Sequence, residues 1–200
     1  MNAINAVPVA RTLSEPTEVE RRHTFLHRPQ MRALCRYVGD LRRSDIGSVP
    51  DFDPLDGGTN AQMLFLLEKP GPKAFKSGFI SRDNDDSTAE ATLRFMELAQ
   101  IPRTEVLLWN VIPAWNGTTK VSRAELEFGI SCLVKLTGIL PRLRSIVFVG
   151  RKAERAMPQF AGRGLNLHFS FHPSPKNYAT ARDKWESIPN SWAKAWTNLQ

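Results

Sequence analysis

Cysteine is scarce in this chain of 200 residues, and its scarcity excludes several kinds of site. The two cysteines, Cys35 and Cys132, do not form a Cys-x-x-Cys pair. Disulfide frameworks and cysteine-ligated zinc or iron–sulfur sites need several cysteines at defined spacings, so the sequence supports neither. His23 and His27 have the spacing of a helical metal pair, but no third ligand is evident. We therefore expect no metal and no organic cofactor.

Long apolar runs are missing as well. No stretch approaches the about 20 apolar residues that span a bilayer, and residues 1–20 lack the basic and apolar regions of a secretory signal. The sequence therefore favours a cytoplasmic protein with no membrane partner. Residues 1–17 have no usable periodicity and predict a flexible N-terminal tail, which leaves residues 18–200 as one expected domain. A monomer is the default expectation.

Positive charge, in contrast, is abundant. The formal net charge is +7 and the isoelectric point is about 9.8. Such a surface field favours polyanionic partners and speeds the encounter with them. Nucleic acid is the leading class of partner, ahead of anionic membrane surfaces.

Four short apolar runs predict strands, and they lie at residues 63–67, 106–111, 146–149 and 165–171. Each run is mostly unalternating, which is typical of a parallel sheet covered on both faces. Helical stretches separate the runs, and the pairs Ser87 with Glu90 and Ser122 with Glu125 match the capping box at a helix start. The alternation predicts an α/β fold: a three-layer αβα sandwich around a central four-stranded, mostly parallel sheet.

The remaining segments complete this prediction. Residues 18–43 are rich in helix formers and predict one or two helices, interrupted at Pro29. Residues 51–60 combine aspartates with proline and glycines and predict a loop. Residues 185–199 are amphipathic and predict a last helix packed against the sheet.

Polar side chains follow the predicted strands. Glu68 follows the first run, Asn110 lies near the end of the second, Gly150 and Arg151 follow the third, and His172 follows the fourth. The carboxyl ends of parallel strands form the edge at which open sheets bind ligands. Any one of these residues is easily explained as structural, so the joint placement is what favours a site.

These residues resemble the uracil-DNA glycosylase superfamily. Glu68-Lys69-Pro70-Gly71 is similar to its Gly-Glu-Ala-Pro-Gly motif, and the segment from His172 to Pro175 matches its His-Pro-Ser-Pro motif. Asn110, after an apolar strand, and Phe79, in Gly-Phe-Ile-Ser, fall where that superfamily carries a base-reading asparagine and a base-stacking aromatic ring. The resemblance extends from about residue 63 to residue 175. It implies base excision from DNA, with uracil-containing DNA as the partner and a flipped base in the site.

The resemblance also implies a role for each residue. Cleavage of the bond between base and sugar builds positive charge on the sugar and negative charge on the base. Glu68 is expected to stabilise the sugar cation and orient water, and His172 to donate a hydrogen bond to the departing base. Asn110, Phe79 and Gly71 are expected to bind the base, because an amide can pair with N3–H and O4 of uracil and a ring can stack on it. The expected DNA-backbone contacts are Ser174, Lys176, Arg82 and Lys69.

The match has departures. Leu67 replaces the first glycine of the motif, and Lys69 stands where some branches carry a second catalytic polar residue. Gly71 stands where one branch uses a tyrosine to exclude the methyl group of thymine. Lys176 and Asn177 replace an apolar wedge, with Tyr178 as a possible substitute.

Two other functions therefore remain open at this stage. The first is a catalytically silent member of the same fold that binds damaged or single-stranded DNA. The second is a hydrolase of a nucleotide or another small anion, although the chain has no phosphate-binding loop of the P-loop kind and no Gly-x-Ser-x-Gly elbow.

Overall fold

The computed structural model describes residues 9–199, so the first eight residues of the predicted tail lie outside the described part. The central sheet has four strands in the order β4-β2-β5-β6, and all neighbouring pairs are parallel. These strands are β2 (Met63–Leu67), β4 (Val106–Asn110), β5 (Ser145–Val149) and β6 (Asn166–Ser170). All four lie within one residue of the predicted runs or inside them, and the predicted parallel sheet is confirmed.

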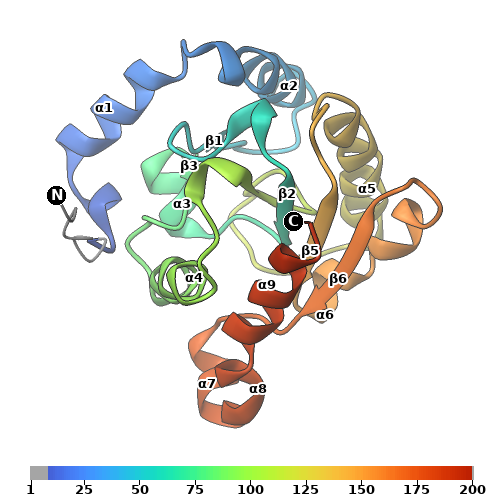
Figure 1. Ribbon diagram of the computed structural model, residues 1–200. Helices are drawn as coiled ribbons and strands as arrows, with labels where there is room; N and C mark the ends of the chain where they lie inside the picture. Colours follow the sequence, from blue (N-terminus) through green and yellow to red (C-terminus); the bar gives the residue numbers. More distant parts are fainter. Residues whose placement is uncertain (1–8, 200) are drawn as a thin grey trace, which may run out of the picture.

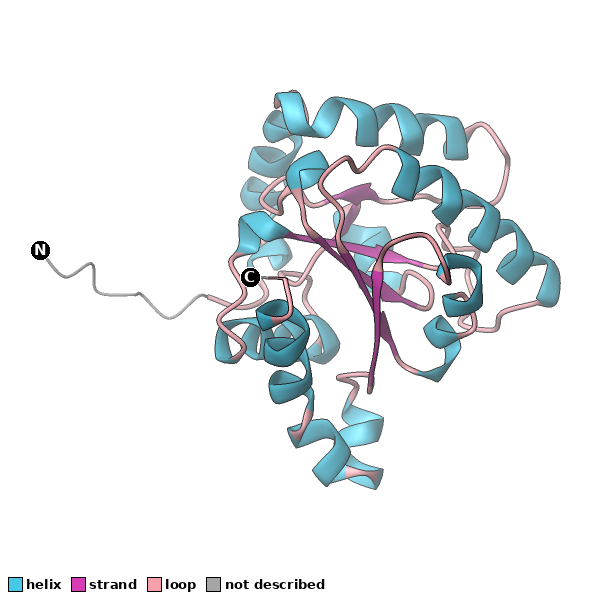
Figure 2. Ribbon diagram, turned by 45° about the vertical axis from the view of Figure 1, so that its right-hand side comes forward, coloured by secondary structure: helices cyan, strands magenta, loops and turns pink. Residues whose placement is uncertain are grey.

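Helices lie on both sides of this sheet (Figure 1, Figure 2). Their bounds are α1 (Pro16–Phe25), α2 (Arg32–Arg42), α3 (Pro72–Ser77), α4 (Ser87–Leu98), α5 (Arg123–Gly138), α6 (Arg151–Glu154), α7 (Pro175–Thr180), α8 (Arg182–Glu186) and α9 (Ile188–Thr197). No helix within residues 9–199 is long and apolar enough to cross a membrane.

Aromatic side chains join α4 and α9 to one face of the sheet. The ring of Trp192 on α9 lies 4.9 Å from that of Phe65 on β2 and 6.0 Å from that of Phe95 on α4. Its indole nitrogen donates a hydrogen bond of 2.7 Å to the hydroxyl of Ser170 on β6. The buried side chain of Trp192 therefore links α9 to β2, to β6 and to α4.

The opposite face packs against α2 and α5. Trp109 follows Leu108 on β4, and because successive strand residues point to opposite faces it lies on the other side of the sheet. Its ring stacks on Phe52 at 3.8 Å and meets the edge of Tyr37 on α2 at 6.2 Å. The hydroxyl of Tyr37 donates to the carbonyl of Cys132 on α5 at 3.0 Å. Together the two faces give the predicted three-layer αβα sandwich.

A small second sheet corrects one prediction. Strands β1 (Asp51–Phe52) and β3 (Phe79–Ile80) pair in parallel, whereas the sequence predicts a loop over residues 51–60. Two residues are too few to give a sequence signal, and the pairing depends on a partner almost thirty positions later. The rest of that segment is turns, with a short 3-10 helix at Gly58–Asn60.

The helix starts are predicted partly correctly. Ser122 and Glu125 form the complete capping box at the start of α5. The start of α4 is different, because the carboxylate of Asp86 accepts hydrogen bonds from the amides of Thr88 and Ala89. Asp86 thus takes the capping position one residue before Ser87, and the predicted Ser87 and Glu90 box is wrong.

The packed part of the chain begins before residue 18. Helix α1 starts at Pro16, and Leu13 in the preceding 3-10 turn is buried. The amide of Leu13 donates to the carbonyl of Asp83 at 3.1 Å, and Arg11 forms an ion pair with Glu90 at 2.9 Å. The predicted tail boundary is therefore too late, because residues 11–17 are held by contacts that no local pattern reveals.

A buried ion cluster joins this N-terminal segment to the loop between β3 and α4. It consists of Arg22, Arg82, Arg103, Asp53, Asp56 and Asp83. Arg22 of α1 lies 2.5 Å from Asp53 and 2.6 Å from Asp83, and its side chain is only 2% exposed. Arg103 lies within 3.1 Å of all three carboxylates. The three positive and three negative charges balance, which is how such a cluster tolerates burial.

Replacing Arg22 by methionine tests how much this ion cluster stabilises the fold. The substitution removes one cation and leaves two buried carboxylates short of a partner, so we expect the free energy of unfolding to fall by about 3–5 kcal/mol. Urea unfolding at neutral pH measures this change. The matched control is Arg43→Met, because Arg43 has a side chain that is 74% exposed. We expect that control to change stability by no more than about 0.5 kcal/mol. Equal effects of the two substitutions would contradict a structural role for the cluster.

Candidate functional site

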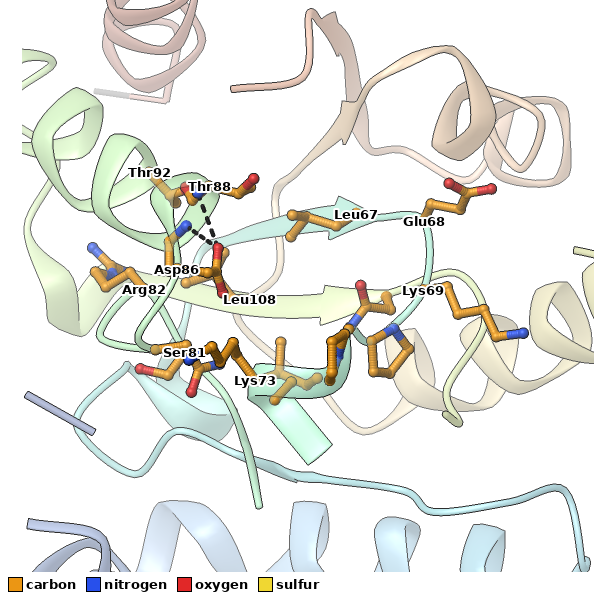
Figure 3. Close-up of a pocket in the computed structure, with 18 of the residues that line it drawn as sticks. Leu67, Glu68, Lys69, Lys73, Ser81, Arg82, Asp86, Thr88, Thr92 and Leu108 are labelled. Atoms are coloured by element: carbon orange, nitrogen blue, oxygen red, sulfur yellow. Dashed lines mark hydrogen bonds between the residues drawn. The ribbon is translucent and has the colours of Figure 1, made fainter. Parts of the chain in front are cut away.

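A cavity of about 390 Å³ opens at the carboxyl edge of the sheet. Its walls come from the ends of β2 and β4, the loop after β2 and the start of α3. The loop between β3 and α4, one side of α4 and His172, the second residue after β6, complete them. In Figure 3, strands β2 and β4 run through the middle of this site, with α4 on one side. Among the lining residues are Glu68, Gly71, Asn110 and His172. The structure therefore brings together four of the residues predicted from strand ends and motifs.

Glu68 follows β2 at a point where the sheet is still hydrogen-bonded. Its carbonyl accepts from the amide of Ile112 at 2.8 Å, which extends the β2–β4 pairing beyond the strands. The backbone of Glu68 is thus fixed while its carboxylate remains partly accessible, at 24% exposure. Oxygen Oε1 lies 2.8 Å from Nζ of Lys152, in an ion pair whose angles are not those of a hydrogen bond.

His172 follows β6 and is held close to Gly150, the residue after β5. The backbone of Gly150 has φ of +90°, and a Cβ there would lie 3.1 Å from Cβ of His172. Only glycine adopts this positive φ without strain and also leaves the space that a Cβ would take from His172. The close approach brings the histidine loop over the end of β5, and Asn177 fixes the loop by donating from its side chain to the carbonyl of His172 at 2.9 Å.

The imidazole of His172 is neutral near neutral pH. Burial lowers the pKa of His172 to about 4, and the nearby positive charge of Lys152 adds to this effect. A neutral imidazole keeps one N–H as a donor and one nitrogen as an acceptor. The group can therefore donate a hydrogen bond to a ligand without carrying a positive charge.

Asn110 is the last residue of β4 and pairs in register with Leu67. Its side chain lies on the same face as Leu108, two residues earlier, and both line the cavity. Asn110 is 4% exposed, so its amide lies deep in the cavity. An amide in that position presents one donor and one acceptor group to a planar ligand.

Gly71 lies at the cavity rim, just before α3. A Cβ built on Gly71 meets nothing within 4 Å, and its φ of −100° is open to any residue. The site therefore has open space where a larger side chain could be accommodated.

Phe79 does not line the cavity, and the prediction that it stacks on a base is contradicted. Its side chain is 0% exposed, and its ring packs against that of His23 at 4.7 Å. Its neighbour Ile80 lines the cavity instead, because successive residues of β3 point to opposite sides. The Gly-Phe-Ile-Ser segment has the expected composition, but the strand turns the ring towards α1.

Lys69 is a structural residue, which corrects its prediction as a DNA-backbone contact. Its side chain is 3% exposed, and Nζ donates to three acceptors: Oδ1 of Asn116 at 2.7 Å, the carbonyl of Lys120 at 3.0 Å and Oε1 of Glu125 at 2.7 Å. The Lys69 hydrogen bond and the capping amide of Ser122 hold the pKa of Glu125 at about 2. The three donors of the ammonium are therefore used to join the loop after β2 to the start of α5, and none is left for phosphate.

Arg82 is likewise committed to the interior. It borders the cavity on the side away from Lys69 (Figure 3), but its side chain is 1% exposed and lies 3.2 Å from Asp56 in the buried ion cluster. Burial raises the pKa of Asp56 to about 6 in spite of Arg82 and Arg103. A cation this deeply buried cannot reach a phosphate at the surface, so this prediction is also corrected.

The other two predicted backbone contacts lie outside the cavity. Ser174 caps α7, because its hydroxyl accepts from the amide of Asn177 at 3.3 Å. Lys176 is exposed on the first turn of the same helix. Both stay predictions, since an exposed ammonium and a hydroxyl proton are still available to a phosphate.

Two components of the site are not among the residues predicted from the sequence. Lys152, in α6 after Gly150, pairs with Glu68 and lowers the pKa of His172. It lies at the carboxyl end of β5, so its position at the shared edge was a signal that could have identified it. The second component is the wall from α4, formed by Thr88, Ala89 and Thr92. No motif marks that wall, because it depends on how the helix packs.

No cluster of three or more potential metal ligands occurs within residues 9–199. The polar groups that line the cavity include the carboxylate of Glu68, the neutral imidazole of His172 and the amide of Asn110. Asp86 and Asn84 line it too, but Asp86 caps α4, and Asn84 is hydrogen-bonded to Ser77 and Phe79. The first three groups can stabilise a cation on one side of a ligand and accept developing negative charge on the other.

Comparisons with known proteins give distant similarities. No protein-family model and no curated protein match this sequence. Among solved structures, the chain is similar to a candidate uracil DNA glycosylase from Methanosarcina acetivorans, with 20% identity and a TM-score of 0.44, over 68% of this chain and 92% of that one. It is also similar to the wild-type UNG of Nitratifractor salsuginis, with 13% identity and a TM-score of 0.46, over 92% of this chain and 98% of that one.

Proposed function

We propose that this protein removes uracil from DNA by hydrolysing the bond between base and deoxyribose. One observation carries the proposal: Glu68 and His172, a hundred positions apart in the sequence, line a single cavity together with Asn110. A cavity of about 390 Å³ is of the size that binds small ligands, and a flipped base is such a ligand. The acid, the imidazole and the amide match the needs of the reaction.

Glu68 acts on the sugar side of the reaction. As the bond breaks, positive charge develops on the deoxyribose, and the carboxylate stabilises it and orients the attacking water. The ion pair with Lys152 restricts the position of the carboxylate. Lys152 is thereby a positioning residue in this mechanism.

His172 and Asn110 act on the base. The departing uracil carries negative charge, and a neutral imidazole donates a hydrogen bond to it in a site where water competes little. Asn110 pairs its amide oxygen with N3–H and its amide nitrogen with O4 of uracil, whereas cytosine presents the reverse pattern. The electropositive surface of a chain with net charge +7 attracts the DNA backbone.

The direct test uses an oligonucleotide with one deoxyuridine in single-stranded, U·G and U·A form. We expect the wild-type protein to make the strand alkali-labile at that position. Glu68→Gln and His172→Ala should each lower kcat by about 100- to 10,000-fold, because each removes one group that acts only on the transition state. The matched control is Glu154→Gln, which removes a carboxylate on α6 that pairs with Arg151 outside the cavity.

Folded protein that releases no base from any of the three substrates would refute this function. Salt-sensitive binding of DNA without base release would instead support the catalytically silent alternative. Faster cleavage of free deoxyuridine than of DNA would support the hydrolase of small substrates.

The protonation of His172 gives a second prediction. We expect its ring resonances in an NMR titration to move with a midpoint near pH 4 instead of the ordinary 6.5. Lys152→Ala should raise this midpoint, because it removes a neighbouring positive charge. The unfolded chain takes up a proton at His172 as the pH falls below 6.5, whereas the folded protein does so only near pH 4. The contribution of His172 to stability is therefore complete above pH 6.5 and is lost as the pH falls from 6.5 to about 4. A midpoint near 6.5 in the wild type would contradict the neutral imidazole.

Gly71 gives a third prediction, on substrate range. The open space at this position leaves room for a substituent on the base, so we expect excision of a 5-substituted uracil such as 5-hydroxymethyluracil as well as uracil. Gly71→Tyr should fill this space and reduce excision of the larger base by at least about 10-fold relative to uracil. A difference of one methylene group between two substrates in a tight pocket already gives discrimination of about that size. Gly71→Ala is the control, since its Cβ meets no neighbour and should change neither rate. Unchanged selectivity in the tyrosine variant would show that the base does not pass this position.

A further inference from the structure

A second cavity lies next to the first, and α4 and the loop of His172 and Pro173 contribute to both. Its volume is about 560 Å³, and it lies between α4 and the segment that follows His172, in which α7 and α8 form the lower end of the molecule in Figure 1. The residues that matter for its chemistry are Arg94, Leu98, Pro173, Tyr178, Arg182 and Trp185. The proposed uracil excision does not use any of them.

Aromatic rings dominate this groove. The rings of Tyr178 and Trp185 meet edge to face, with centroids 5.0 Å apart, and Trp185 in turn packs on Phe95 of α4 at 4.6 Å. Tyr178 is nevertheless 43% exposed, and Leu98 beside it is 60% exposed. Few large apolar side chains within residues 9–199 are this exposed, and two of them lie in this one groove. The ring of Tyr178 thus packs against Trp185 and still remains partly exposed.

The groove also carries positive charge. The guanidinium of Arg182 lies 4.8 Å from the centroid of the Tyr178 ring, and its own ion pair is with Glu186 at 2.8 Å. Arg94 on α4 is exposed at the opposite wall, and no carboxylate within the described residues forms an ion pair with it. Aromatic faces beside arginine side chains are the combination with which proteins bind unpaired bases of a single strand.

The two cavities share their dividing wall. His172 lines the first cavity and Pro173 lines the second, so adjacent residues of one loop face both. Likewise, Thr88 and Thr92 of α4 line the first, while Ser87 and Phe95 line the second. The two cavities are therefore adjacent, as binding sites for neighbouring nucleotides of one strand must be.

We propose that the second cavity binds an unpaired base of single-stranded DNA, that of a nucleotide next to the one held in the first cavity. The base stacks on the exposed ring of Tyr178, and Arg94 faces the backbone of the same nucleotide. Stacking requires that this base be free of a complementary strand. The inference extends the proposed uracil excision by assigning it a preference for single-stranded substrate.

Binding of uracil-free oligothymidylate tests the groove without any catalytic step. Tyr178→Leu keeps an apolar side chain on Trp185 but removes the ring, and we expect it to weaken binding by about 5- to 150-fold, as measured by fluorescence anisotropy at fixed salt. Tyr178→Phe keeps the ring and should bind like the wild type. Phe128→Ala is the matched control, because Phe128 is a similarly exposed aromatic residue, 37% accessible, on α5 and away from this groove.

The same variants in the excision assay separate the two proposals. If uracil is released, Tyr178→Leu should lower kcat/KM on single-stranded substrate by a similar factor and leave the rate on U·A duplex much less affected. Loss of binding in Tyr178→Leu without any base release by the wild type would support the groove and refute the proposed function. Equal binding by wild type and Tyr178→Leu, with or without base release, would overturn the groove proposal, as would an equal loss in Phe128→Ala.

Discussion

The parallel pairing of β2 with β4 and β5, and of β5 with β6, is the constraint on which the site depends. Backbone hydrogen bonds fix the register of these strands, so the residues that follow them emerge at one edge. The pairing continues past the strand ends, where the carbonyls of Leu67 and Glu68 accept from Val111 and Ile112 at 2.8 Å. A slip of one residue would turn Asn110 to the other face of the sheet and remove it from the cavity. The sheet therefore fixes the backbone positions of Glu68 and Asn110.

Charge in this protein has two different uses. The cations nearest the cavity are mostly committed to the fold: Lys69 to the start of α5, and Arg82 to the buried ion cluster. They brace the two loops that frame the cavity, which leaves Lys152 as the cation that interacts with the proposed catalytic carboxylate. The charges available to a nucleic acid lie farther out, on exposed helix surfaces such as that of Lys176 and Arg94. A chain can thus have a high net charge while its central loops are held by locally neutral pairs.

The departures from the motif acquire a physical explanation in the structure. Lys69, one of the departures from the motif, holds the loop after β2 in place, because its ammonium is buried among three acceptors. The ion pair of Lys69 with Glu125 joins the loop after β2 to the capped start of α5. Gly71 and Gly150 show the opposite case, in which a missing side chain is the useful property. One leaves space at the rim, and the other lets the histidine loop approach the end of β5.

The sequence by itself determined the layers of the fold, the four strands of the central sheet and the residues at their ends. Unalternating apolar runs and helix starts are local patterns, and in a parallel sheet local position is enough to place Glu68, Asn110 and His172 at one edge. Tertiary structure alone decided which side chains at that edge face the cavity. Phe79 has the residue type of a stacking ring, but the pairing of β3 with β1 turns this ring into the core. Lys69 and Arg82 have the residue type of surface cations, but both side chains are buried in ion pairs with carboxylates distant in the sequence. Side-chain direction and ion pairing depend on neighbours that are brought together only by folding, which is why no local pattern could give them.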